Sequence, residues 1–211
     1  MKIYKYMTDD TFRDHLDSHL RGEVYLSLWR EFNDPMEGYF SFFIKHHRMD
    51  IVDAVVSEKS EYRVSCFSNS DNKYLLWSYY TNKHSGVCLE YEVDKDQLPS
   101  NCILEKITYT AFMPKYDATR DINQQAQRFL LTKTAALKRE GEIRLLCRNP
   151  HNDVIVIGTL TSIIFGMRCS HETKQQVETA IQIGHYNNPT LYLAEIKSDR
   201  IRISRRKLEH D

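Results

Sequence analysis

The order of strand-like and helix-like segments is the feature that most restricts the fold of this chain. Runs of β-branched and aromatic residues predict strands, and apolar residues at helical spacing predict helices. Strands are predicted at residues 2–6, 24–28, 62–67, 87–93, 103–108, 142–147, 154–157, 162–165, 190–197 and 200–204. Helices are predicted at residues 9–20, 47–59, 73–81, 121–139 and 171–183. Strands and helices do not alternate regularly, and the strands cluster in the second half. This order favours an α+β fold with a mixed, largely antiparallel sheet and flanking helices over a doubly wound sheet. Residues 103–108 are expected to pair with residues 87–93.

Length and composition predict a single domain spanning residues 1–211. Of the 211 residues, 41% are apolar and 27% are charged, as in an ordinary globular protein. A chain of this length buries roughly 70% of its unfolded surface, so its core is stable without a cross-link. Seven glycines and five prolines argue against long linkers.

The cysteines predict neither a disulfide framework nor a metal site. The chain has five of them, an odd number, widely spaced and without a C-x-x-C pair. Cys66, Cys88 and Cys147 lie within apolar runs, where a thiol behaves as a small buried hydrophobe.

Charge and hydropathy limit the partners. Lysine plus arginine equals aspartate plus glutamate at 29 each, whereas a dedicated duplex-DNA binder carries a basic excess. Residues 1–6 are short, charged and strand-like, unlike a signal peptide. The longest apolar stretches fall below the roughly 20 residues that cross a bilayer. We therefore expect a cytoplasmic protein without a membrane partner.

The strongest chemical signal is the segment Arg139-Glu140-Gly141-Glu142-Ile143-Arg144. In a strand, alternate side chains share a face, so Glu140, Glu142 and Arg144 are predicted to point to one side. Two carboxylates and a guanidinium there could stabilise a developing cation or anchor ribose hydroxyls. A solvated ion-paired face is the competing interpretation.

Two further polar segments are candidates. Trp77, Tyr80 and His84 would share one face if the helix at 73–81 continued, and could stack a flat ring; a core stripe is the common alternative. A histidine near a helix end often titrates near neutrality. The turn Asn33-Asp34-Pro35, followed by Glu37, is a structural turn or the rim of a pocket.

The ordered motifs together resemble the bacterial domain-of-unknown-function 2971 family along nearly the whole chain. The stretches that carry the resemblance are Tyr4-Lys5-Tyr6, Phe32-Asn33-Asp34-Pro35-Met36-Glu37, Cys66-Phe67-Ser68, Trp77-Ser78-Tyr79-Tyr80, His84-Ser85-Gly86-Val87-Cys88-Leu89-Glu90, Glu140-Gly141-Glu142-Ile143-Arg144 and Ile164-Phe165-Gly166. This family association suggests a toxin or phage-defence effector.

A looser resemblance is to ADP-ribosyltransferase folds, which carry a first-strand polar residue, a Ser-rich middle strand and a later Glu-x-Glu. Lys5 or Tyr6, Ser65 with Ser68, and Glu140-x-Glu142 occur in that order. The resemblance implies that Glu142 binds the ribose and stabilises an oxocarbenium-like transition state, while Glu140 activates the acceptor. It also implies that a serine orients the glutamate and that an aromatic ring stacks the nicotinamide.

The resulting hypothesis is an enzyme that cleaves or transfers at the glycosidic bond of NAD or a similar nucleotide. NAD is a substrate here rather than a tightly bound cofactor, and a protein or nucleic acid is the acceptor. The predicted catalytic residues are Glu142, Glu140 and His84, with no metal. The predicted ligand-binding residues are Lys5, Tyr6, Ser68, Trp77, Tyr80, Asn33 and Arg144.

Two alternatives remain open. In a non-catalytic ligand-sensing or protein-interaction module, Glu140, Glu142 and Arg144 form an ion-paired structural face. In a Mg²⁺-dependent nuclease or nucleotide hydrolase, Asp34, Glu37 and Glu142 surround the metal, because carboxylates suit that ion.

Overall fold

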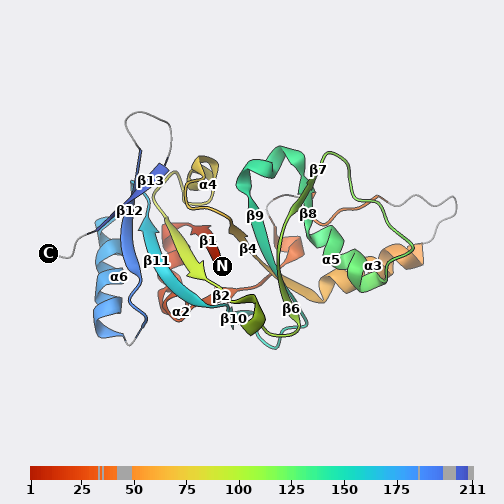
Figure 1. Ribbon diagram of the computed structural model, residues 1–211, viewed down its shortest axis with the longest axis horizontal. Helices are drawn as coiled ribbons and strands as arrows, with labels where there is room; N and C mark the ends of the chain where they lie inside the picture. Colours follow the sequence, from red (N-terminus) through yellow and green to blue (C-terminus); the bar gives the residue numbers. More distant parts are fainter. Residues whose placement is uncertain (33, 35, 42–48, 185, 197–202, 209–211) are drawn as a thin grey trace. The chain divides into compact units, whose positions relative to one another are not determined.

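The structure is a computed structural model that describes residues 1–32, 34, 36–41, 49–184, 186–196 and 203–208 (Figure 1). Its contacts divide the chain into two compact units. Unit 1 comprises Met1–Val24, Phe67–Gln97 and Ile155–Asp211, and unit 2 comprises Tyr25–Cys66 and Leu98–Val154. A single domain over residues 1–211 stays a prediction.

The predicted α+β class with a mostly antiparallel sheet and flanking helices is confirmed. The antiparallel pairs include β1 (Lys2–Met7) with β4 (Tyr62–Ser68) and with β5 (Val87–Glu92), β5 with β11 (Thr159–Phe165), β12 (Thr190–Ile196) with β13 (Ile203–Lys207), β3 (Ser27–Leu28) with β4, and β6 (Cys102–Lys106) with β9 (Glu142–Arg148). Parallel pairs are β11 with β12, and β7 (Thr108–Thr110) with β8 (Thr132–Thr134). The connection between β11 and β12 contains a helix, as is usual for a parallel crossover.

Unit 1 contains the strand order β13-β12-β11-β5-β1. The strands are β1 (Lys2–Met7), β5 (Val87–Glu92), β11 (Thr159–Phe165), β12 (Thr190–Ile196) and β13 (Ile203–Lys207). The helices are α1 (Asp9–Asp14), α2 (Leu16–Leu20), α4 (Tyr74–Tyr79), η2 (Lys95–Gln97) and α6 (His171–Ile183). A buried cluster on this sheet comprises Trp77, Cys88, Ile164, Ala194 and Ile203.

Unit 2 holds the short strand β3 (Ser27–Leu28) and the strands β6 (Cys102–Lys106), β7 (Thr108–Thr110), β8 (Thr132–Thr134) and β9 (Glu142–Arg148). Its helices are η1 (Trp29–Glu31), α3 (Met49–Ser60), α5 (Ile122–Leu130) and η3 (Ala135–Glu140). The strand β4 (Tyr62–Ser68) contributes residues 62–66 to this unit and residues 67–68 to unit 1. The short strands β2 (Glu23–Tyr25) and β10 (Val154–Val156) pair with each other.

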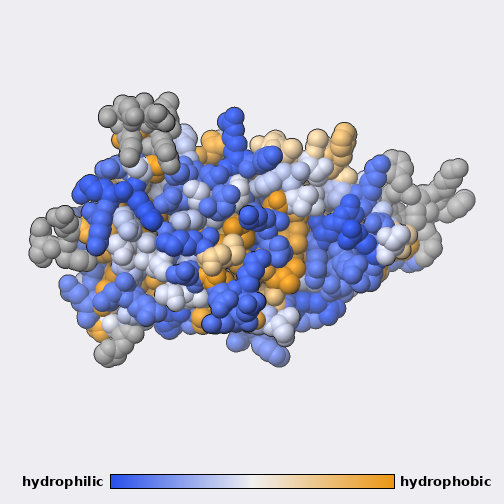
Figure 2. Space-filling model, in the orientation of Figure 1, coloured by the Kyte–Doolittle hydropathy of each residue, from blue (hydrophilic) through white to orange (hydrophobic). Residues whose placement is uncertain are grey.

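The core of unit 2 forms where α5 packs on β4 and β9. The buried residues are Tyr62, Val64, Ala126, Leu130 and Leu146. The helix α5 also packs against α3. The visible surface over these two helices is mostly hydrophilic in Figure 2, as expected for helices with one buried face.

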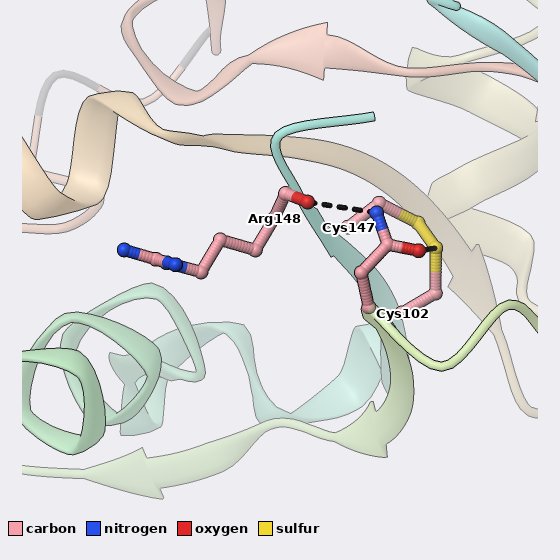
Figure 3. Close-up of a disulfide and its surroundings, with 4 residues drawn as sticks. Cys102, Cys147 and Arg148 are labelled. Carbon is pink, nitrogen blue, oxygen red and sulfur yellow. Dashed lines mark hydrogen bonds between the residues drawn. A yellow bond between two sulfur atoms is a disulfide. The ribbon is translucent and has the colours of Figure 1, made fainter. Parts of the chain in front are cut away.

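The prediction that the chain lacks a disulfide is wrong. The antiparallel pairing of β6 and β9 places Cys102 opposite Cys147, with 4.0 Å between their Cα atoms, and the two residues form a disulfide (Figure 3). The sequence separation of 45 residues hid this pair, because the register of the two strands brings them together. Cys66, Cys88 and Cys169 are free cysteines.

Three predicted elements also need correction. The long helix at 121–139 ends at Leu130, because residues 132–134 form β8 beside β7. The helix at 9–20 is interrupted at His15, whose φ of −125° is not helical. Residues 103–108 do not pair with residues 87–93: β6 pairs with β9, and β5 lies between β1 and β11.

Within the residues that the structure describes, no helix is both long and apolar enough to cross a membrane.

Candidate functional site

The strand β9 introduces two charged side chains into the interior of unit 2. Glu142 and Arg144 are two residues apart, so they point to the same side of the strand. Arg144 is 0% exposed and Glu142 is 7% exposed. Burial of such charges is costly unless each is paired and hydrogen-bonded, so their partners decide what the site can do.

Arg144 is fully engaged by neighbouring groups. Its Nε donates to Glu142 Oε1 at 2.5 Å, its Nη1 donates to the Leu130 carbonyl at 2.7 Å, and its Nη2 donates to Glu37 Oε2. The guanidinium lies over the Phe32 ring, 5.0 Å from the ring centroid. Each of the three guanidinium nitrogens therefore has a partner within the protein.

Lys133 contacts one carboxylate oxygen of each of three glutamates. Its Nζ lies 2.8 Å from Glu142 Oε2, 2.8 Å from Glu140 Oε2 and 3.1 Å from Glu37 Oε1. Burial opposes the charge of Lys133, but Glu142 and Glu37 raise its pKa above the usual lysine value. The ammonium therefore stays protonated at neutral pH.

Together these five side chains form a buried ion cluster, defined as Glu37, Lys133, Glu140, Glu142 and Arg144. Both oxygens of Glu142 accept from cations of the cluster. Burial alone would raise the pKa of Glu142. The nearby charges of Arg144 and then Lys133 together lower the pKa by more than burial raises it, so the net pKa lies below the usual glutamate value. Glu142 is a carboxylate at neutral pH and has no proton to donate.

Tyr109 binds the backbone N–H of Glu142 in the cluster. Its hydroxyl accepts from the Glu142 N–H at 2.8 Å. In the parallel β7–β8 pair, Tyr109 lies opposite Lys133, so the two strands present both side chains to the cluster. The sequence interpretation missed Tyr109 and Lys133, although the alternation in Thr132-Lys133-Thr134 is a strand signal.

Glu140 reaches the cluster by a route that the sequence did not predict. It ends the 3-10 helix η3 instead of lying on a strand with Glu142, and β9 begins at Glu142. Between them, Gly141 adopts the left-handed conformation with φ of 58°. The prediction that Glu140 shares a strand face with Glu142 and Arg144 is therefore wrong, and Glu140 meets Glu142 through the Lys133 ammonium instead.

The turn around Asp34 supplies Glu37. Asp34 Oδ1 accepts from the Met36 N–H at 2.9 Å, and the Glu37 N–H donates to the Asp34 carbonyl at 3.1 Å. Glu37 is 8% exposed, so it points into the unit rather than over a rim. Asn33, a predicted ligand-binding residue, lies outside the described residues.

The three carboxylates that the Mg²⁺ alternative requires, Asp34, Glu37 and Glu142, are engaged by other groups of the protein. Glu37 and Glu142 are bridged by Arg144 and Lys133, and the carboxylate of Asp34 serves the turn. In the part of the chain that the structure describes, no group of three or more His, Cys, Asp or Glu residues is arranged to hold a metal ion.

The other predicted site residues belong to unit 1. They are Lys5, Tyr6, Ser68, Trp77, Tyr80 and His84. The combination of this set with Glu142 in one cleft stays a prediction.

Trp77 is a core residue of unit 1. It is 0% exposed, its Nε1 donates to the Asp71 carbonyl at 2.7 Å, and the Tyr6 ring contacts its edge at 5.3 Å between centroids. Tyr80 is exposed, and α4 ends at Tyr79. The helix therefore does not continue, and the predicted shared face of Trp77, Tyr80 and His84 does not form.

His84 lies in a strained turn. Asn82, Lys83 and His84 all have positive φ, with values of 46°, 58° and 70°. The His84 ring stacks on Trp77 at 6.1 Å, and its Nε2 lies 3.4 Å from Ser78 Oγ. Burial lowers the pKa of His84 below the usual histidine value, which favours the neutral ring.

The polar groups of Tyr6 and Lys5 are also engaged by neighbours in unit 1. The Tyr6 hydroxyl donates to the Ser70 carbonyl at 2.9 Å and accepts from the Lys73 N–H at 3.2 Å. The Lys5 ammonium lies 4.9 Å from the centroid of the Phe67 ring. Ser68 is buried opposite Tyr4 at the end of β4.

A pocket of about 680 Å³ opens on the other face of the β7–β8 pair. Thr108, Thr110 and Thr132 line it, whereas the intervening Tyr109 and Lys133 reach the ion cluster. Since alternate side chains of a strand point to opposite faces, the two strands separate the pocket from the cluster. Its volume lies in the range of small-molecule sites.

Comparison with protein-family models, curated proteins and solved structures finds no match to this chain.

Proposed function

We propose that this protein is a non-catalytic ligand-binding module for a small molecule, with the buried ion cluster as its scaffold. The observation that carries the proposal is the division made by β7 and β8. Both carboxylate oxygens of Glu142, a predicted catalytic residue, are engaged by Lys133 and Arg144 on one face, and a pocket of ligand size opens on the other. The looser resemblance to ADP-ribosyltransferase folds supports a nucleotide such as NAD as the ligand.

The saturation of Glu142 is the physical reason for a scaffold role. A carboxylate that stabilises an oxocarbenium-like cation must face the substrate. Both Glu142 oxygens instead accept hydrogen bonds from the buried cations Lys133 and Arg144. If Glu142 turned toward a substrate, it would lose these contacts with the two buried cations, which is costly. The cluster fixes β8, β9 and the end of η3 relative to one another.

The test measures ligand binding and turnover side by side. We expect NAD or another nucleotide to raise the melting temperature of the wild-type protein, because a ligand that binds only the folded state stabilises it. We expect no release of nicotinamide from NAD. If no nucleotide raises the melting temperature, the proposal is wrong.

The Glu142→Gln substitution separates the scaffold role from catalysis. Removal of one partner from a buried charge pair typically costs about 3–5 kcal/mol, so we expect a loss of that order in the free energy of unfolding, measured by urea denaturation. Glu172→Gln is the control, because Glu172 is 69% exposed, and its loss should be small. A Glu142→Gln protein as stable as the wild type would contradict the scaffold role.

ADP-ribosyl transfer or NAD hydrolysis on an ADP-ribosyltransferase-like fold is the second candidate. The observation that favours it is the pair Glu140 and Glu142, whose carboxylates share the Lys133 ammonium. Nicotinamide release by the wild type that Glu140→Gln or Glu142→Gln abolishes, and Glu172→Gln retains, would establish it over the binding module. Circular dichroism of each variant checks that the protein is folded.

A further inference from the structure

The pocket beside β7 and β8 has a positive lining. Lys106, Lys115, Arg120 and Arg128 line it, against the single carboxylate of Glu105. Arg120 also pairs with Asp117 outside the lining, at 3.2 Å. A concave surface with an excess of one charge attracts a ligand of the opposite charge. The charge of the pocket therefore selects an anion.

Arg128 is a cation of the lining that contacts within the protein hold in place. Its Nη1 donates to the Lys115 carbonyl at 2.7 Å, which ties α5 to the loop at 111–121. The guanidinium also lies 5.8 Å from the centroid of the Phe129 ring. A guanidinium carries five N–H donors in a rigid plane, a geometry that matches the oxygens of a phosphate.

Hydroxyl groups line the strand wall of the pocket. Thr108, Thr110 and Thr132 lie there because they occupy alternate positions of β7 and the first position of β8. Thr110 Oγ1 accepts from the Phe112 N–H at 3.1 Å, which fixes the start of the loop. A hydroxyl can both donate to a phosphate and accept from a sugar.

The rim of the pocket carries an exposed aromatic ring. Phe112 is 81% exposed and the adjacent Met113 is 37% exposed, although both are large apolar side chains. An exposed ring beside a group of cations is the combination that stacks a nucleobase while its phosphate is neutralised.

We propose that this pocket binds a nucleoside phosphate, with the base stacked on Phe112 and the phosphate held by Arg128 and its neighbouring cations. The inference rests on the proposed function and names the ligand class and its site. Inorganic phosphate alone would leave the ring and most of the volume unused. A free nucleotide and a strand of nucleic acid share this chemistry, and the experiment distinguishes them.

The test is isothermal titration calorimetry of the full chain with ADP, adenosine, pyrophosphate and a short single-stranded oligonucleotide. We expect ADP to bind at least roughly tenfold more tightly than adenosine or pyrophosphate, since both halves of the ligand contribute. An oligonucleotide that binds more tightly than ADP identifies nucleic acid as the source, and weaker binding identifies a free nucleotide.

Variants locate the binding site. Phe112→Ala and Arg128→Gln should each weaken ADP binding by roughly tenfold or more. Arg128 also holds the loop, so Lys106→Gln, at an exposed lysine of the same lining, is a second charge variant that tests the cation requirement. The matched controls are Lys138→Gln, an exposed lysine of unit 2 outside the lining, and Tyr79→Ala, a 73% exposed aromatic residue of unit 1. Both controls should leave ADP binding unchanged.

Two results would overturn the inference. Adenosine binding as tightly as ADP would exclude recognition of the phosphate, and undiminished ADP binding by Phe112→Ala and Lys106→Gln would place the ligand elsewhere. In the second case the ligand-binding module itself would survive. Release of nicotinamide from NAD that is lost in Glu140→Gln or Glu142→Gln would instead contradict the proposed function. That result would not contradict nucleotide binding in this pocket.

Discussion

At the scale of single residues, the burial of charge explains more of this protein than any motif does. Arg144 is 0% exposed, yet each of its guanidinium nitrogens donates to Glu142, Glu37 or the Leu130 carbonyl. Replacing an ion pair of this kind with apolar residues often costs nothing, whereas removing one partner destabilises the fold. Single substitutions in the cluster are therefore expected to destabilise the fold. The cluster also specifies how its strands fit together.

His19 shows the opposite solution, a titratable ring that is buried without charge. It is 5% exposed, its Nδ1 lies 3.0 Å from the Tyr91 hydroxyl, and its ring stacks on Phe12. Burial, with a smaller contribution from Lys5, lowers the pKa of His19 to about 4. The unfolded chain binds a proton near pH 6.5, and the folded protein does not until pH 4.

The resulting prediction concerns stability between pH 6.5 and pH 4. In that window the unfolded state binds more protons, so the free energy of unfolding falls as the pH falls. The depressed pKa corresponds to a loss of about 3 kcal/mol from this group across the window. Urea denaturation at a series of pH values measures it.

The control for this prediction is a pair of variants. His19→Gln should lose this part of the pH dependence, whereas His15→Gln, at an exposed histidine between α1 and α2, should keep it. A His19→Gln protein whose stability falls with pH as steeply as that of the wild type would show that other groups cause the decline.

At the scale of elements, the site depends on short pieces that interrupt longer ones. The helix α5 stops at Leu130 so that β8 can pair with β7, and this pairing places Lys133 beside Tyr109. Gly141 then caps η3 and directly precedes β9. These breaks bring Lys133, Glu140 and Glu142 together within ten residues of chain.

Gly141 is the position at which this geometry can be tested. Its φ of 58° is left-handed, a conformation that costs an L-residue roughly 1–2 kcal/mol and that asparagine tolerates better than alanine. We expect Gly141→Ala to lower the free energy of unfolding by about 1–2 kcal/mol and Gly141→Asn to lower it less. Chemical denaturation measures both, and equal losses would argue against the left-handed conformation.

At the scale of the whole molecule, β2, β4 and β10 are each divided between the two units, and β4 is the longest of them. Residues 62–66 pack in unit 2, and Ser68 pairs with Tyr4 of β1 in unit 1. A unit that unfolded alone would disrupt one end of a continuous strand. The single domain over residues 1–211 stays a prediction, and this divided strand is the feature on which its test turns.

Calorimetry tests the single domain. We expect one cooperative thermal transition, with a calorimetric enthalpy equal to the van't Hoff enthalpy, because β4 couples the two units. Two resolved transitions, or a calorimetric enthalpy well above the van't Hoff value, would show that the units unfold separately.

Local patterns in the sequence predicted the elements whose residues have strong intrinsic preferences. The strands β1, β4 and β5 follow runs of β-branched and aromatic residues, and β9 follows an apolar run. The helix α6 follows apolar spacing after Ser170, which caps it in the structure. The shared strand face of Glu142 and Arg144 was also predicted, because alternation along a strand is a local property, whereas Glu140 lies on η3. Lys133 was missed because residues 121–139 look helical, and tertiary pairing overrode that preference.

The sequence by itself determined the α+β class and the acidic and basic residues from which a site can be built, since periodicity and composition are local properties. Only the tertiary structure decided which of these residues meet. The register of β6 on β9 joined Cys102 to Cys147, and the pairing of β7 with β8 turned Lys133 toward the glutamates and the threonines toward the pocket. Strand register depends on contacts between distant segments, and a shift of one residue exchanges the two faces, so no local pattern could fix it.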